Sequence, residues 1–78
     1  MLNLMEKLIG ILKSVCPGVD FENEKALCDD GIINSLDIVL IVSELMDAYG
    51  VEIDIDDLVP ENFNTAESIL ALVEKAQG

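Results

Sequence analysis

One serine stands out among the few residues of this chain that could do chemistry. Ser35 lies in the segment Asp-Gly-Ile-Ile-Asn-Ser-Leu-Asp, residues 30–37, between a glycine-broken acidic stretch and an amphipathic segment. A catalytic serine needs a neighbouring base, but the chain has no histidine. Lys25 is the only lysine near this segment, and nothing in the sequence places it beside the serine. We therefore expect Ser35 to be modified rather than to act as a nucleophile, and the protein not to be an enzyme.

The position of Ser35 suits a phosphate ester. Asn34 is a good N-cap, and Asp37 follows three residues later, so a helix is predicted to begin at Asn34 or Ser35. A hydroxyl in the first turn lies beside unpaired backbone N–H groups and the positive end of the helix dipole. On position alone, however, an ordinary capping or solvated serine is the more common case.

The remaining chemical groups do not form a metal site. Cys16 and Cys28 lie 12 residues apart with no CxxC pair and no histidine, which argues against zinc. An EF-hand loop with Gly31 at its sixth position would begin at Ala26, which has no oxygen side chain. We expect no metal site, and we favour reduced thiols with Cys16 buried over a disulfide.

The element before this site is predicted to be an amphipathic helix. Apolar residues recur at helical spacing up to Cys16, and Pro17-Gly18 ends the pattern. Residues 19–34 show no helical period, and we therefore expect a long loop whose aliphatic and aromatic side chains attach it to the core. A loop of this length in a small domain is usually functional. The helix stripe comprises Met5, Leu8, Ile9, Leu12, Val15 and Cys16, and the loop anchors are Val19, Phe21, Ala26, Leu27, Ile32 and Ile33.

The second helix is predicted to end at Gly50. Residues 51–55 alternate like a strand but have no partner segment, so we expect an extended connector with inward-facing aliphatic side chains, and a short helical turn over 56–59. Asn64 or Thr65 is expected to cap a last helix. The expected buried positions are Ile38, Val42, Leu45, Met46 and Tyr49 in the second helix and Ile69, Leu70, Leu72, Val73 and Ala76 in the last. In addition, Glu67 lies three residues after Asn64, as in a capping box.

These elements predict an all-α fold, a bundle of three main helices plus a short extra helix with a long loop after the first, in a single domain over residues 1–78. Hydrophobic residues make up 51% of the chain and aromatic residues only 4%, so the core must be aliphatic.

The longest apolar run, residues 38–42, is far too short to span a membrane, and no signal-peptide pattern is present. We expect a cytoplasmic location.

The net charge of −12 restricts the partners of the protein. It disfavours nucleic acid and anionic lipid and favours proteins with Lys/Arg patches, although an acidic surface is also common simply for solubility. Two leucines, Leu36 and Leu40, fall among acids on the polar side of the second helix. They fit a recognition surface with an apolar centre, unless the loop or the last helix covers them. The acids on this side are Asp37, Glu44 and Asp47.

Taken together, these features resemble the acyl carrier protein family. The resemblance covers nearly the whole chain: a first helix, a long loop, Asn-Ser-Leu opening the second helix, a Gly-Val-x-Ile connector, a short acidic turn and a final helix. It implies that Ser35 carries a 4′-phosphopantetheine arm, whose thiol holds cargo as a thioester while partner enzymes do the chemistry. The implied partners are a phosphopantetheinyl transferase, which uses coenzyme A and magnesium, and acid-activating ligases and acyltransferases with basic docking surfaces.

The resemblance also assigns partner-recognition positions and shows two departures. Leu36, Asp37, Glu44 and Asp47 match positions where carriers meet partners, and we expect Asn34 and Leu40 to take part in partner recognition as well. Asn34 replaces the aspartate that usually precedes the serine, and Leu40 replaces an acid found in many fatty-acid carriers, which implies a different partner.

Two further functions stay open. The spacing of Gly31 to Ser35 and the segment Glu-Asn-Phe-Asn-Thr, residues 61–65, are similar to D-alanyl carrier proteins of cell-wall polymer modification. The first alternative to a stand-alone fatty-acyl or polyketide carrier is thus an amino-acid carrier. The second is an unmodified acidic helical adaptor that binds a basic partner through Leu36 and Leu40. We expect a monomer in each case.

Overall fold

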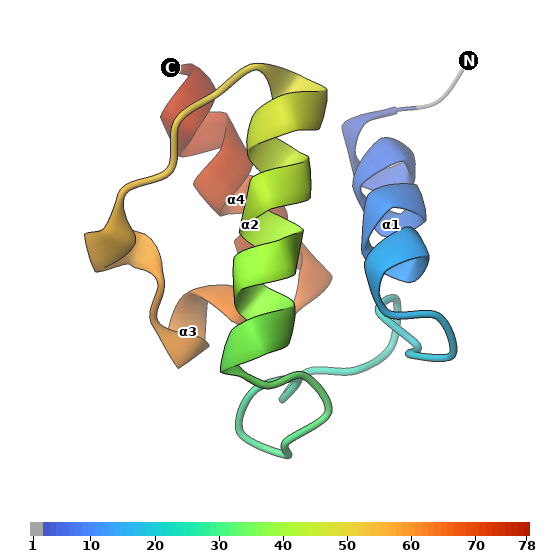
Figure 1. The fold of residues 1–78 in the computed structure, drawn as a ribbon. Helices are drawn as coiled ribbons and strands as arrows, with labels where there is room; N and C mark the ends of the chain where they lie inside the picture. Colours follow the sequence, from blue (N-terminus) through green and yellow to red (C-terminus); the bar gives the residue numbers. More distant parts are fainter. Residues whose placement is uncertain (1–2) are drawn as a thin grey trace.

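A computed structural model describes residues 3–78 and contains helices but no strand within that range (Figure 1). The predicted all-α architecture is confirmed, including the long loop after the first helix. The elements in chain order are α1 (Leu4–Val15), α2 (Ser35–Tyr49), a 3-10 turn η1 (Ile55–Asp57), α3 (Pro60–Phe63) and α4 (Ala66–Gln77).

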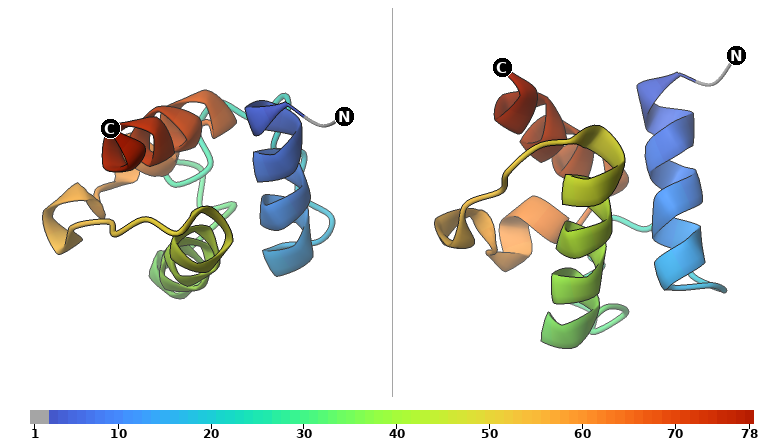
Figure 2. Two further views of the ribbon diagram at one scale, coloured as in Figure 1. Left: turned by 90° about the horizontal axis from the view of Figure 1, so that it is seen from above. Right: turned by 45° about the horizontal axis from the view of Figure 1, so that its top comes forward.

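The long loop lets α1 and α2 pack side by side in opposite directions (Figures 1 and 2). Helix α4 packs against α1, and the short α3 packs against α4. The loop crosses beneath the helices and leads into the first turn of α2 (Figure 1). The start of α2 is therefore held at one end of the bundle, near the end of α1.

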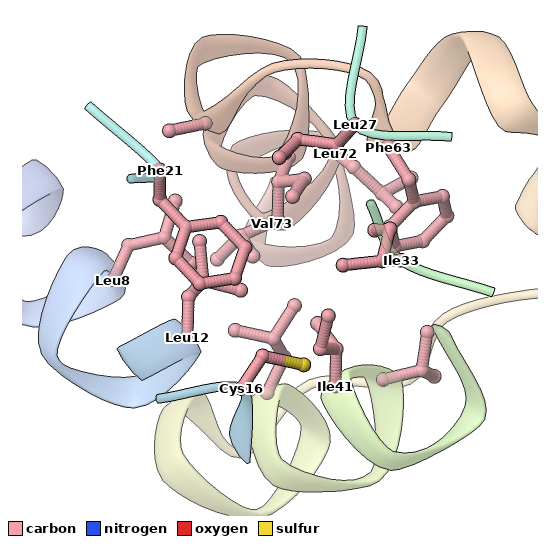
Figure 3. Close-up of a cluster of buried hydrophobic side chains, with 14 residues drawn as sticks. Leu8, Leu12, Cys16, Phe21, Leu27, Ile33, Ile41, Phe63, Leu72 and Val73 are labelled. Atoms are coloured by element: carbon pink, nitrogen blue, oxygen red, sulfur yellow. The ribbon is translucent and has the colours of Figure 1, made fainter. Parts of the chain in front are cut away.

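Aliphatic side chains with two aromatic rings fill the space between the helices (Figure 3). Phe21 and Phe63 are completely buried, and no polar or charged residue within the described chain is buried. The loop contributes Phe21, Leu27 and Ile33 to the core, and Val19 and Ile32 pack against it, so the predicted anchoring of this loop is confirmed for five of its six residues. The remaining buried members are Leu8, Leu12, Cys16, Ile41, Val42, Leu45, Ala66, Ile69, Leu72 and Val73.

The helix ends follow local sequence signals. The side chain of Asn3 caps α1. Gly50 takes the left-handed conformation (φ 65°) and ends α2, as the sequence predicted. The predicted capping box of the last helix is wrong. Thr65 is the N-cap and forms the box with Ser68, whose backbone N–H donates to Thr65 Oγ1 at 2.9 Å.

The connector after α2 differs from the prediction at its end. Ile53 packs against the core as expected, but Ile55 is 81% exposed. The strand-like alternation ends because η1 begins at Ile55, one residue before the predicted turn, and changes the direction of its side chain. Helix α3 was not predicted. It starts at Pro60, whose missing N–H is harmless at the first helical position.

Candidate functional site

Ser35 is the first residue of α2, where a reciprocal pair of hydrogen bonds fixes the chain. The Asn34 side chain accepts from the backbone N–H of Asp37 at 2.9 Å, and the Asp37 carboxylate accepts from the N–H of Asn34 at 3.0 Å. This capping box satisfies two donors that would otherwise lack partners. It fixes the backbone on both sides of Ser35, so the serine occupies a defined position.

The environment of Ser35 fits a covalently attached phosphodiester. Ser35 is exposed, and its hydroxyl makes no hydrogen bond to the described part of the chain. The first-turn N–H groups of Ser35 and Leu36 have no carbonyl within the helix to pair with. The positive end of the α2 dipole favours a nearby negative charge. A reactive partner can thus reach the hydroxyl, and a phosphate there would be stabilised.

A shallow hollow of about 290 Å³ lies beside Ser35 and opens to solvent. Gly31, with a φ of 72°, lets the loop turn at its rim. The hollow can hold a few atoms of a flexible group that starts at Ser35, but it does not enclose a ligand. It is lined by Cys28, Gly31, Ile33, Asn34, Ser35, Ile38 and Pro60.

The predicted recognition residues are on the open side of α2. Leu36 and Leu40 are 67% and 49% exposed, so neither the loop nor α4 covers them. Val39, which the sequence reasoning missed, is 55% exposed and lies one turn after Leu36. The spacing of Val39 from Leu36 is the signal that identifies it. We call the exposed residues Leu36, Val39, Leu40, Glu44 and Asp47 the α2 face.

Asn34 and Asp37, which we also expect to contact partners, form structural contacts at the start of α2. Both side chains are engaged in the capping box, and Asp37 is half-buried. They therefore shape the start of α2, whereas the carboxylates of Glu44 and Asp47 form no ion pair within residues 3–78.

All four lysines contact other segments of the chain, and within residues 3–78 none forms an ion pair with an acid of the α2 face. Lys13 pairs with Glu22, Lys25 with Glu67 and Lys75 with Asp57, with N–O distances of 2.9–3.3 Å. The Lys7 ammonium lies 4.6 Å from the centre of the Tyr49 ring and donates to the carbonyl of Ala48. These exposed pairs add little stability. Within residues 3–78, these pairs leave Glu44 and Asp47 of the α2 face without a basic partner.

The Lys25–Glu67 pair also decides the role of Lys25. Its hydrogen bond lowers the pKa of the Glu67 carboxyl and ties the loop to the first turn of α4. Lys25 is thus engaged away from the serine rather than poised as its base.

The two cysteines are free thiols, as expected. Burial raises the pKa of the Cys16 thiol, and the nearby Asp37 carboxylate raises it further. Burial, followed by the charge of Asp29, raises the pKa of Cys28. Both groups are held in the less reactive protonated form. Within residues 3–78 no cluster of three or more histidine, cysteine or acidic side chains could hold a metal ion.

Comparison with known families agrees with this arrangement. A family described as the phosphopantetheine attachment site matches residues 3–73, which is most of the chain. The chain belongs to this family. It is therefore a carrier domain rather than a catalyst, with covalently attached 4′-phosphopantetheine as its cofactor, and the predicted resemblance to acyl carrier proteins is confirmed.

The carrier domain has no match among curated proteins or among solved structures. Carrier domains of this family interact generally with phosphopantetheinyl transferases and acyl-handling enzymes. Within residues 3–78 of this protein, no helix has both the length and the apolar character needed to cross a bilayer.

Proposed function

We propose that residues 1–78 form one carrier domain that bears 4′-phosphopantetheine on Ser35. The observation that carries this proposal is the exposed, unbonded hydroxyl of Ser35 at the start of α2, in a chain that belongs to a phosphopantetheine-attachment family. The group supplies a terminal thiol on which acyl or aminoacyl cargo is held as a thioester. Asn34 and Asp37 fix the backbone around the attachment point, and the hollow beside Ser35 gives the first atoms of the group room to lie.

The proposed partners act on this domain in turn. A phosphopantetheinyl transferase installs the group from coenzyme A, and a ligase or acyltransferase loads and unloads the thiol. The α2 face, apolar at Leu36, Val39 and Leu40 and acidic at Glu44 and Asp47, suits enzymes with basic docking surfaces around an apolar centre. Because these partners do the chemistry, the absence of a histidine from the chain is no obstacle.

A small aminoacyl cargo, as in D-alanyl carriers of cell-wall polymers, is the second candidate. The hollow beside Ser35 is shallow and open, and a cluster of buried aliphatic side chains with two phenylalanine rings fills the centre of the bundle. A long acyl chain would have to open that core to be hidden from water, whereas an amino acid can stay at the surface. This observation favours a small polar cargo over a long-chain fatty acid.

The test is to incubate the purified protein with coenzyme A, magnesium and a broad-specificity phosphopantetheinyl transferase. Intact mass should increase by one phosphopantetheinyl group, and peptide mapping should place it on Ser35. Loading of the modified protein with an aminoacyl or a long acyl group then separates the cargo classes. A long chain that the core sequesters should raise the melting temperature, whereas an exposed amino acid should leave it unchanged. Modification at another residue would overturn the assignment of Ser35.

A further inference from the structure

Asn64 forms several hydrogen bonds, through its side chain and its backbone, with the loop that leads to Ser35. Its Oδ1 atom accepts from the backbone N–H groups of Cys28 at 2.9 Å and Asp29 at 3.1 Å. Its Nδ2 group donates to the Asp29 carboxylate at 3.2 Å. Its backbone carbonyl accepts from the N–H of Leu27 at 3.0 Å. One residue between α3 and α4 thus holds three consecutive loop residues that are more than 30 positions away in sequence.

A backbone hydrogen bond connects the segment that Asn64 holds with the residues that precede the serine. The N–H of Ile33 donates to the carbonyl of Leu27 at 3.0 Å, which closes the loop back on the segment that Asn64 holds. Leu27, Ile33 and Phe63 are all members of the buried cluster (Figure 3). Ile33 is followed by Asn34, the N-cap of α2, and then by Ser35.

The segment held in this way reaches the surface beside Ser35 through Cys28. Cys28, Gly31 and Ile33 line the hollow next to the serine, together with Pro60 from α3. Asp29 and Asp30, the next two residues along the loop, are exposed and acidic. A transferase that reaches the Ser35 hydroxyl meets this loop surface, and an ordered surface costs less conformational entropy to bind than a mobile one.

We propose that Asn64 is a positioning residue for installation of the arm, an inference that rests on the proposed function. It holds residues 27–29 in the arrangement that the transferase binds. The capping box of Asn34 and Asp37 fixes Ser35 itself and does not include Asn64. Loss of the Asn64 side chain therefore weakens recognition of the loop without displacing the reacting hydroxyl.

The test is steady-state kinetics of phosphopantetheine transfer from coenzyme A to Asn64→Ala. We expect the KM for the carrier to rise about tenfold, with kcat within about twofold of wild type. Amide hydrogen exchange at Cys28 and Asp29, whose N–H groups lose their acceptor, should quicken in this variant, whereas Leu27 keeps the backbone carbonyl of residue 64 as its acceptor. Asn62→Ala is the matched control, since the Asn62 side chain donates to the carbonyl of Asp57 and holds η1 instead of the loop. It should leave the KM unchanged.

A rescue pair keeps the inference testable if Asn64→Ala does not fold. Asn64→Asp retains the oxygen that accepts from Cys28 and Asp29 but places a carboxylate against the carboxylate of Asp29. It should raise the KM, and adding Asp29→Asn, which restores a donor at this contact, should return the KM toward wild type. Asp29→Asn alone gives the baseline for any direct effect of that charge.

The outcomes separate the inference from the proposed function. A folded Asn64→Ala with a wild-type KM, an equal effect of Asn62→Ala, or no rescue of Asn64→Asp by Asp29→Asn would overturn the positioning role. Wild-type protein that gains no phosphopantetheine at Ser35 would overturn the proposed function, and the inference with it. Ser35→Ala supplies the blank for the assay.

Discussion

Two side chains, those of Asn34 and Asp37, define how Ser35 is presented. The sequence alone identified Asn34 as the cap because a short amide before an apolar periodic segment is a strong local signal. The second half of the box, in which Asp37 accepts from the N–H of Asn34, appeared only in the structure. At the last helix the same kind of signal was ambiguous, since Asn64 and Thr65 are adjacent and both can cap. Tertiary contacts decide it, because Asn64 is engaged with the loop.

Replacement of the cap should destabilise the domain. Asn34→Ala removes the acceptor for the N–H of Asp37 and should lower the free energy of unfolding by about 1 kcal/mol in urea titrations. Asn34→Asp keeps an acceptor at this position and should retain most of the stability. Asn23→Ala, which removes an exposed loop contact to Asp20, is the control and should change stability by less than about 0.5 kcal/mol. Equal losses in Asn34→Ala and Asn23→Ala would contradict the capping role.

Helix α2 has one side that packs in the core and stabilises the fold, and another side that is open and available to a partner. The expected buried residues Val42 and Leu45 are confirmed, and Ile38, Met46 and Tyr49 are partly buried. The sequence reasoning missed Ile41 because apolar residues occur nearly all around the first half of α2, so periodicity alone did not separate its faces. The position of α1, which packs on this side, determines which of them are covered.

Adjacent residues of α2 should differ sharply in their contribution to stability. Ile41→Ala removes a completely buried side chain and should cost about 2–5 kcal/mol, a large part of the stability of so small a domain. Leu40→Ala removes a side chain that is half exposed and should cost much less. Thermal unfolding followed by circular dichroism measures both. A larger loss for Leu40→Ala would mean that the faces of α2 are assigned the wrong way round.

The open side of α2 should govern partner binding without governing stability. Leu36→Ala combined with Glu44→Lys should weaken binding to the transferase at least tenfold, because it removes apolar area and reverses a charge on the α2 face. The melting temperature should change little. Glu74→Lys makes the same charge reversal at an exposed position of α4 and should retain near-normal affinity. Isothermal titration at two salt concentrations checks this, and affinity that does not fall with salt would contradict the electrostatic part of the account.

At the scale of the whole molecule, the sequence predicted the class of fold more fully than the short segments that connect the main helices. Aliphatic residues at helical spacing were sufficient to predict the bundle and the long loop. The direction of Ile55 and the separate helix α3 could not be predicted, because short turns depend on what they pack against. Likewise, Lys7, Lys25 and Lys75 contact segments 18 to 42 positions away in the chain, and these contacts follow from the folded arrangement and leave no sequence signal.

The stability of the whole domain should decrease at alkaline pH. Burial raises the pKa of Cys16, Cys28 and Tyr49, so each of these groups binds its proton more tightly in the folded state. The thiol contribution is complete below the ordinary thiol pKa of 9.0 and is lost as the pH rises through the higher folded-state pKa. The melting temperature should therefore begin to fall near pH 9.

Replacement of the buried thiol tests the source of this decrease. Cys16→Ala should have a lower melting temperature at pH 7 because it leaves a small cavity, but its decline from pH 8 to pH 10 should be shallower than that of wild type. Cys28→Ala should show the same change in slope. Slopes that match wild type in both variants would rule out the thiols as the titrating groups.

The central claim is that Ser35 alone accepts the phosphopantetheine arm, and its most direct test is intact mass after reaction with coenzyme A and transferase. Ser43 is the matched control, because it is a second exposed serine on α2 that lies within the helix instead of at its start. Wild type and Ser43→Ala should each gain one phosphopantetheinyl group, and Ser35→Ala should gain none. A group on Ser35→Ala, or none on wild type while another carrier is modified in parallel, would contradict the account.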